Sequence, residues 1–353
     1  MKLLRLFLSL ILGLLTLVAP NFTKAADTGA GYSISKIKPP IEEANSESSF
    51  FDLVVYPGQE FVIQTYLKNY SQNETIIKSE PYTTFTNSHG EISYTAPLSE
   101  KKRDKSLKLP FASVAEIEDG PLVILKGNEE KVVSMKIKIP ATAQNGVILG
   151  SWYFEKKEQA TNQLEKENNT QMDNCFAYAL AVKLTVNQEI AAPNLNLLTV
   201  EPALDNYRKV IHAQVQADQA AIVSELDFEG RITRKGKTDT LFNTQLIDRT
   251  MAPNSNFNIP FYLANQQLVA GEYTLYLTAK TTDKKWEKES WRWTKDFKVS
   301  KNNAEKINQA AINDPEPEKN YLKYILLAII ILLFFTILFM CLRNKSKLKV
   351  LRK

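Results

Sequence analysis

Several stretches of the chain alternate between hydrophobic and polar residues, which is the pattern of a β-strand with one buried face. In "FVIQTYLK", every second residue from Phe61 to Leu67 is predicted to face a core. In "EKVVSMKIKIP", the same holds from Val133 to Ile139. Nearby segments such as "YPGQ" and "NSHGE" contain the Pro, Gly and Asn residues that are typical of turns. These patterns predict strands joined by short turns.

Two further segments are hydrophobic on both alternating faces. They are "NGVILGSWYF" at residues 145–154 and "CFAYALAVKLTV" at residues 175–186, and both are predicted to be central strands of a sheet. Between them, residues 155–173 are charged and rich in Gln and Asn. Such a composition is typical of an exposed hairpin tip.

The second half of the chain has the same character, with short strands separated by turn residues and without long helical patterns. After Ser300, "KNNAEKINQAAI" predicts a short helix, and "NDPEPEKN" predicts an extended acidic stalk. Many short strands at close spacing predict an all-β fold. We expect two tandem immunoglobulin-like β-sandwich domains, at residues 31–187 and 188–300.

Both ends of the chain carry targeting patterns. A positive start and an apolar run of 13 residues, Leu6 to Val18, predict a signal peptide at residues 1–25. Residues 324–342 form an uncharged run that predicts one transmembrane helix, and residues 301–323 form the linker before it. The basic tail, residues 343–353, predicts a cytoplasmic C-terminus. The predicted localisation is the cell membrane, single-pass, with the ectodomain outside at the cell wall.

Charge and cysteine content change the choice of partners. Residues 26–320 hold 34 Lys and Arg against 39 Asp and Glu, a net charge of −5. This acidic balance gives no support to nucleic-acid binding. The same residues contain a single cysteine, Cys175, which excludes a disulfide within them. An exported chain without disulfides is more typical of a Gram-positive bacterium than of an animal.

The residues that usually perform chemistry are scarce. His89 lies in a glycine-containing turn and His212 in a predicted strand, and a hydrolytic triad would need one of them. The acidic segment "EIEDG", residues 116–120, lacks the spacing of a calcium loop. We therefore predict a chain that is not an enzyme, with no catalytic residue, no metal site and no cofactor.

Aromatic residues are the remaining candidates for ligand contact, because flat rings stack on sugars and anchor interfaces. Trp291 and Trp293 share the face of a strand with apolar residues, which favours a place in the core. Trp152 and Tyr153 point to opposite faces of one strand, and Trp286 lies in the charged stretch "DKKWEKES". Trp152, Tyr153 and Trp286 are the predicted binding residues.

Two sets of motifs resemble one known family, the WxL-interacting proteins of Gram-positive bacteria. "MAPNSNF", "GEYTLYLTAK" and "WRWTKDFKVS" resemble the family's C-terminal extracellular domain. "YPGQ", Asn69, "TNSHGEISY" and "IPATAQNGVILG" resemble its N-terminal domain. The chain departs from the family at Gly150-Ser151, where paired glycines are usual, and near Trp293, where a Phe is usual.

The resemblance implies a peptidoglycan-binding segment at about residues 31–155 and a host-binding segment at about residues 166–304. It also implies partnership with WxL-domain surface proteins and binding to host extracellular matrix proteins. The predicted function is a non-catalytic cell-surface scaffold or adhesin. A cell-wall glycan or peptide hydrolase and a surface receptor subunit are the alternatives. Residues 251–261 are interpreted as a fixed turn in which Asn254, Ser255 and Asn256 cap their own backbone, with a recognition loop as the alternative.

Overall fold

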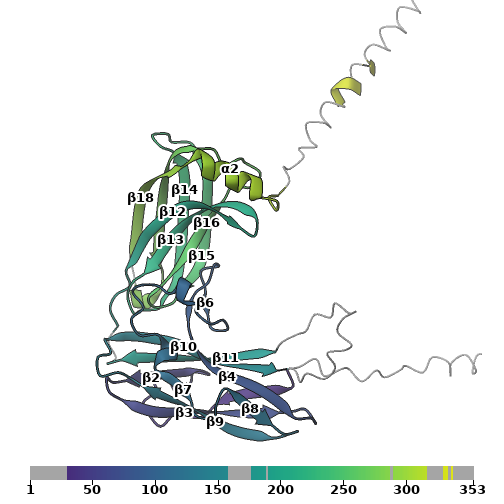
Figure 1. Ribbon diagram of the computed structural model, residues 1–353. Coiled ribbons are helices and arrows are strands. Elements are labelled where there is room, and N and C mark those ends of the chain that lie inside the picture. Colours follow the sequence, from purple (N-terminus) through teal and green to yellow (C-terminus); the bar gives the residue numbers. More distant parts are fainter. Residues whose placement is uncertain are drawn as a thin grey trace, which may run out of the picture.

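The computed structural model describes residues 30–157, 176–187, 190–286, 289–315, 329–332 and 335–336. The predicted signal peptide, the basic tail and Cys175 lie outside the described residues. The predicted hairpin tip lies outside them from residue 158 onward. Figure 1 shows that the described strands gather into two units joined end to end. We call residues 30–187 the N-terminal unit and residues 190–315 the C-terminal unit.

Two sheets form the N-terminal unit, with strand orders β1-β3-β9-β7 and β2-β11-β10-β4-β8. A small ribbon of β5 and β6 projects toward the other unit (Figure 1). The elements are, in chain order, β1 (Tyr32–Lys36), β2 (Phe51–Val55), β3 (Glu60–Asn69), β4 (Thr75–Thr83), β5 (Phe85–Thr86), β6 (Ile92–Ser93), η1 (Glu100–Lys102), η2 (Phe111–Ser113), β7 (Ala115–Ile117), β8 (Leu122–Leu125), β9 (Glu130–Lys138), β10 (Gly146–Lys157) and β11 (Ala177–Val186).

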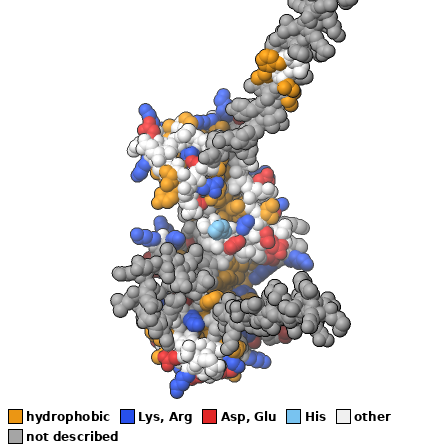
Figure 2. Space-filling view, turned by 90° about the vertical axis from the view of Figure 1, so that its right-hand side faces the viewer, with side chains coloured by type: hydrophobic (Ala, Val, Ile, Leu, Met, Phe, Trp, Pro, Cys, Tyr) orange, Lys and Arg blue, Asp and Glu red, His pale blue; other side chains and the backbone are white. Residues whose placement is uncertain are grey.

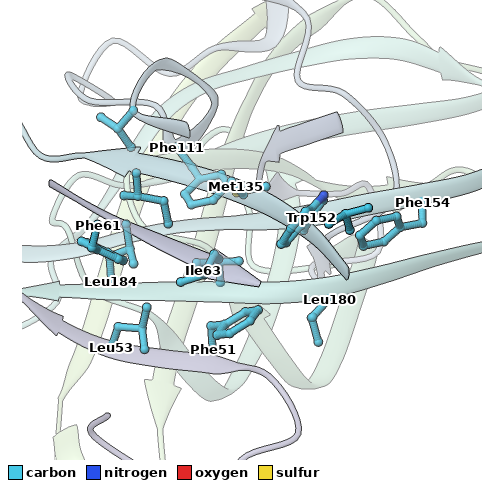
Figure 3. Packing of buried hydrophobic residues seen from close by; sticks show 14 of the residues in the cluster. Phe51, Leu53, Phe61, Ile63, Phe111, Met135, Trp152, Phe154, Leu180 and Leu184 are labelled. Carbon is cyan, nitrogen blue, oxygen red and sulfur yellow. The ribbon is translucent and has the colours of Figure 1, made fainter. Parts of the chain in front are cut away.

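The alternating stretches form the strands that the sequence predicts. Along β3, Phe61, Ile63 and Leu67 enter the core together with Thr65, and the alternate positions Val62, Gln64 and Tyr66 stay more accessible. Along β9, Met135 and Ile137 are fully buried. Figure 3 shows side chains from both sheets meeting in this core. Because the apolar faces of two sheets cover each other, both patterns are satisfied by one hydrophobic core.

The predicted central strands are also confirmed. β10 is hydrogen-bonded to β11 on one side and to β4 on the other, and its residues from Gly146 to Trp152 are buried. β11 completes this sheet and pairs in parallel with β2, with Val182 opposite Phe51. The strand that follows the predicted hairpin tip therefore belongs to the N-terminal unit.

The C-terminal unit has sheets of order β12-β13-β16 and β15-β14-β17-β18, with a separate hydrophobic core between them. Trp291 and Trp293 pack against this core as predicted. The elements are β12 (Leu195–Asp205), β13 (Arg208–Ala217), β14 (Val223–Arg234), β15 (Thr240–Met251), β16 (Ser255–Tyr262), β17 (Gly271–Thr281), η4 (Lys284–Trp286), β18 (Ser290–Val299) and α2 (Lys301–Ala310).

The turn before β16 agrees in part with its interpretation. Asn254 adopts a positive φ of 50°, and the Ser255 hydroxyl donates to the Ala252 carbonyl at 2.7 Å. Phe257 then enters the core at the start of β16. The two asparagine side chains are the exceptions. The Asn254 amide donates to the distant Asp218 carbonyl, and the Asn256 amide donates to Asp104 of the other unit. The turn is therefore part of an interface, which the sequence did not predict.

The predicted short helix is confirmed as α2, whose N-cap Ser300 accepts a hydrogen bond from the Asn303 backbone. The start of the predicted stalk is not extended away from the unit. Asp314 forms an ion pair with the buried Lys209 of β13, and Asn313 donates to the Asn206 carbonyl. The chain is thus fastened to the β12–β13 hairpin through Asp314.

The predicted membrane localisation is contradicted. Within the part of the chain that the structure describes, no helix has the length and apolar character needed to cross a membrane. A spanning helix needs about 20 apolar residues. Of residues 324–342, only 329–332 and 335–336 are described, and the others lie outside the described residues.

The predicted all-β class is confirmed, because strands dominate the described residues. Each unit has two sheets around its own core. The finer prediction of immunoglobulin-like connectivity stays a prediction. So does the proposed division at residue 188, since residues 188–189 lie outside the described part.

Candidate binding surfaces and the junction of the two units

The two units meet through hydrogen bonds between the β5–β6 ribbon and the turn before β16. The hydroxyl oxygens of Thr86 and Ser255 lie 2.5 Å apart, and both residues are buried. The backbone N–H of Ala252 donates to the Thr86 hydroxyl at 3.0 Å. Since the Ser255 hydroxyl donates to the Ala252 carbonyl, the Thr86 hydroxyl is left to donate to Ser255. The three groups therefore form a closed ring of hydrogen bonds.

Gly90 extends this contact. Its carbonyl accepts from the Thr250 backbone N–H at 2.8 Å. Gly90 has a φ of +74°, and an added Cβ would lie 3.1 Å from the Phe257 ring and from the Arg249 side chain. Both the backbone conformation and the close approach therefore favour glycine. The motifs "TNSHGEISY" and "MAPNSNF", which carried the family resemblance from opposite ends of the chain, contact each other here.

Asp104 forms a second bridge between the units. Its carboxylate accepts from the Gln216 amide at 2.7 Å and from the Asn256 amide at 2.5 Å. Within its own loop it also accepts from the hydroxyl and the backbone N–H of Ser106. Burial raises the pKa of Asp104, but the hydrogen bonds from Ser106, Asn256 and Gln216 outweigh burial and hold the pKa below its ordinary value. Asp104 is therefore a charged acceptor that the junction satisfies with neutral donors.

A third contact lies at the start of β10. The Val147 backbone N–H donates to the Ala220 carbonyl at 2.8 Å. A cavity of about 490 Å³ opens beside this contact and is lined by both units, including Phe111, Gln144 and Asn254. The junction therefore rests on polar contacts from several segments rather than on one linker.

A larger groove of about 620 Å³ lies between the loop that carries η1 and the outer face of sheet β12-β13-β16. The loop contributes basic side chains, and the sheet contributes His212, Gln214 and Asn258. Figure 2 shows charged side chains of both signs gathered around the region where the units meet. The sequence motifs did not predict this groove, because its two sides come from segments that are far apart in the chain.

Trp152, the first predicted binding residue, lies in the core of the N-terminal unit and has no exposed surface. Its ring stacks on Phe154 at a centroid distance of 5.2 Å, and its indole N–H donates to the Ser79 hydroxyl at 2.8 Å. Figure 3 shows the ring pointing among the buried side chains. A ligand cannot reach this ring in the folded unit, so Trp152 has a structural role in the core.

Tyr153 points to the opposite, outer face of the same strand. Its ring stacks on Tyr82 with centroids 4.7 Å apart and an interplanar angle of 21°. The Tyr82 hydroxyl donates to Glu80, and Lys78 forms an ion pair with the same carboxylate at 2.6 Å. Tyr82 is buried, with 9% of its surface exposed, so Tyr153 provides the accessible part of this aromatic platform, next to charged neighbours. Such a platform can stack on a flat ligand.

Trp286 lies in η4 of the C-terminal unit and is half-buried. Its indole N–H donates to the Ile222 carbonyl at 3.1 Å, and the Lys285 ammonium lies 4.9 Å from the ring centroid. The ring is therefore held in place by one edge while part of its surface remains accessible. Among the predicted residues, Tyr153 and Trp286 are the ones that a ligand can reach.

The histidines do not assemble a reactive group in the described residues. His89 is exposed in its turn, and neither His89 nor His212 has a side-chain hydrogen bond to another described residue. Burial lowers the pKa of His212, although the carboxylates of Asp205 and Glu201 oppose the change. The described residues also contain no group of three or more His, Cys, Asp or Glu that could hold a metal ion. The prediction that the chain is not an enzyme stays a prediction.

Comparison with protein families gives two matches in chain order. The model of the WxL Interacting Protein peptidoglycan binding domain matches residues 32–156. The model of the WxL Interacting Protein host binding domain matches residues 167–309. Together the matches cover most of the chain. Both descriptions refer to binding domains and name no catalytic activity.

Other comparisons add little. Among curated proteins, none matches this chain. One similar solved structure is a chain from the chaperone–tip adhesin complex of CFA/I fimbriae. It is 13% identical to this protein, the alignment covers 75% of this protein and 98% of the fimbrial chain, and the TM-score is 0.32. Another is a chain from the CsuC–CsuE chaperone–tip adhesion complex of Acinetobacter baumannii. It is 8% identical, the alignment covers 68% of this protein and 93% of the Acinetobacter chain, and the TM-score is 0.31. These likenesses are too low to carry an argument about function.

Proposed function

The chain belongs to the WxL-interacting protein family, and from this premise we propose that it is a non-catalytic surface scaffold or adhesin. In this proposal the N-terminal domain, residues 31–187, binds peptidoglycan. The C-terminal domain, residues 188–300, binds an extracellular matrix protein of the host. The chain also holds a WxL-domain protein at the surface.

One observation supports this division most strongly. The two family matches fall on two units that have separate hydrophobic cores. Each unit can therefore present its own binding surface while the other unit keeps its structure. The match to the host-binding model begins at residue 167, before β11, although β11 completes a sheet of the N-terminal unit. The segment matched to the host-binding model therefore includes a strand of the N-terminal unit, which agrees with our proposal of a domain division at residue 188.

One partly accessible aromatic residue gives each domain a candidate contact, Tyr153 in the first and Trp286 in the second. We propose that the Tyr82–Tyr153 platform contacts the sugar rings of peptidoglycan, because stacked aromatic rings present a flat apolar surface. Trp286 is the corresponding candidate in the C-terminal domain, where a partly exposed indole can anchor a protein partner. Neither contact requires the ligand to be chemically changed.

Binding of the purified full chain to separate ligands tests the proposal. We expect the chain to bind insoluble peptidoglycan, a WxL-domain protein and at least one host extracellular matrix protein, with serum albumin as the negative control. Tyr153→Ala should weaken binding to peptidoglycan and leave binding to the host protein unchanged. Absence of binding to peptidoglycan by the correctly folded chain would remove the central part of the proposal.

A further inference from the structure

The loop between β6 and η2 carries a dense run of positive charge. Lys101, Lys102 and Lys105 are exposed, and none of their side chains has a partner among the described residues. Arg103 lies beside them, with the Glu100 carboxylate 3.7 Å away and largely exposed. We call Lys101–Lys105 the basic turn. Runs rich in Lys and Arg at an exposed turn are typical of polyanion-binding surfaces.

Asp104, the one acidic residue inside the basic turn, does not neutralise the positive charge that the turn presents to solvent. Asp104 is only 6% exposed and points into the junction, where Gln216 and Asn256 donate to it. The anchoring of Asp104 turns the flanking basic side chains toward solvent. The same contact places the basic turn beside the outer face of sheet β12-β13-β16 and so forms one side of the groove.

The floor of the groove is polar and rich in amides. Cross-strand pairing places Gln216 opposite Asn256, Gln214 opposite Asn258 and His212 opposite Pro260 on this outer face. From Gln216 to His212 the floor extends for about 13 Å, at about 3.3 Å per residue. The amide of Asn258 and the imidazole of His212 have no hydrogen-bond partner among the described residues. Amide groups both donate and accept, as sugar hydroxyls require.

Charge along the groove is uneven. The basic turn lies next to Gln216, whereas Asp205 lines the groove near the hairpin at the opposite end of β13. The Asp205 carboxylate accepts from the Tyr262 hydroxyl at 2.5 Å. A ligand would therefore place its anionic groups at the basic turn and its neutral hydroxyl groups over the amides.

We propose that this groove binds an acidic polysaccharide, a glycan that carries sulfate or carboxylate groups. Sulfate and carboxylate pair with Arg and Lys at the rim, and hydroxyl groups match the amide floor. An acidic peptide fits less well, because extended peptides usually bind by adding a strand to a sheet edge. The floor of this groove is a sheet face. The site needs residues from both units and extends beyond the peptidoglycan and host-protein functions proposed above.

The direct test measures binding of the purified full chain to a heparin oligosaccharide and to an oligogalacturonate, with neutral dextran as the control. The rim variant Lys101→Gln/Lys102→Gln/Lys105→Gln removes three positive charges without touching Asp104. A matched variant, Lys126→Gln/Lys237→Gln/Lys306→Gln, removes three exposed charges elsewhere. We expect the rim variant to lose affinity by about tenfold or more, and the matched variant by less than about twofold.

A second pair of variants tests the floor. Asn258→Asp places a negative charge opposite Gln214 on the floor of the groove and should weaken binding by about fivefold or more at low salt, whereas Asn302→Asp on the exposed side of α2 should not. Binding to heparin alone assigns a sulfated glycan, and binding to both probes assigns acidic glycans in general. Equal losses in the two triple variants, no binding to either probe, or equal binding of polyglutamate would overturn the proposal.

Discussion

The Asp104 carboxylate lies 2.5 Å from the amide nitrogen of Asn256, a residue 152 positions later in the chain. Asp104 belongs to a loop of the N-terminal unit, and Asn256 belongs to β16 of the C-terminal unit. This hydrogen bond joins the two units directly. It also orients the basic turn and places it over the outer face of the neighbouring sheet.

Removal of the Asp104 carboxylate should loosen the junction. Asp104→Ala leaves the Gln216 and Asn256 amides without their acceptor, and hydrogen bonds to a charged group contribute about 1.5–3 kcal/mol. The backbone N–H groups of Ala252 and Thr250, which donate to Thr86 and Gly90 across the junction, should then exchange with deuterium about ten- to a hundredfold faster. Hydrogen–deuterium exchange of the full chain measures this effect.

The control for this experiment is Asp119→Ala. Asp119 is also a loop carboxylate that accepts a backbone hydrogen bond, but its partner Ser134 belongs to the same unit. Its removal should leave exchange at Ala252 unchanged. Unchanged exchange at Ala252 in Asp104→Ala would mean that the other contacts of the junction hold the units together without Asp104.

The junction should weaken in acid. The folded-state pKa of Asp104 lies below its ordinary value of 3.8, so its contribution to stability is present above that value and is lost as pH falls through the lower folded pKa. His212 affects stability over a different pH range. Burial lowers its pKa below the ordinary 6.5, so protonation of His212 reduces stability as pH falls through that higher range. Amide exchange at Ala252, corrected for its intrinsic pH dependence, should therefore show an acid-dependent increase below about pH 4 that Asp104→Asn removes. Identical pH profiles of exchange for the unsubstituted protein and Asp104→Asn would contradict the assignment of this effect to Asp104.

Alternation was sufficient to predict β3 and β9, because a half-buried strand imposes period two on its residues. It could not predict the partner of Asn256. The same amide could cap its own turn or bond to a distant carboxylate, and only the packing of the two units decides between these outcomes. The sequence correctly indicated a turn before β16, but the role of this turn in the interface depends on long-range contacts.

Trp152 and Tyr153 should behave oppositely on substitution, although they are neighbours. Trp152→Ala removes a fully buried ring and the bond to Ser79, so it should lower the free energy of unfolding by about 3–5 kcal/mol. Tyr153→Ala removes a partly exposed ring and should cost less than about 2 kcal/mol while weakening peptidoglycan binding. Denaturant unfolding and sedimentation with peptidoglycan separate the two effects. Normal peptidoglycan binding by a folded Tyr153→Ala variant would exclude the aromatic platform.

Period two placed these two residues on opposite faces, but it could not tell which face was buried. β10 is hydrophobic on both parities, so the pattern lacks a polar side that marks solvent. The buried face is the one that packs on the other sheet of the unit and on η2, where Phe111 covers β10 at Gly150. Only the packing of these distant segments decides between the two faces.

Gly150 should not tolerate a side chain. An added Cβ would lie 2.0 Å from the Phe111 ring, which is itself fully buried. Gly150→Ala should therefore displace Phe111 and lower the free energy of unfolding by about 1–3 kcal/mol. The adjacent Ser151→Ala, which removes a hydrogen bond from the Ser151 hydroxyl to the Tyr94 carbonyl, should cost about 1 kcal/mol. Denaturant unfolding of both variants checks the order, and a larger loss in Ser151→Ala would contradict it.

The most direct measurement of the proposed division of function uses the two units separately. Residues 30–187 and residues 190–315 are expressed alone, their folding is checked by circular dichroism, and each is sedimented with purified peptidoglycan. The account predicts that the first fragment enters the pellet, that the second stays in solution, and that the recovered glycan is chemically unchanged. The account would be contradicted if the second fragment entered the pellet and the first did not, or if the first fragment released soluble muropeptides.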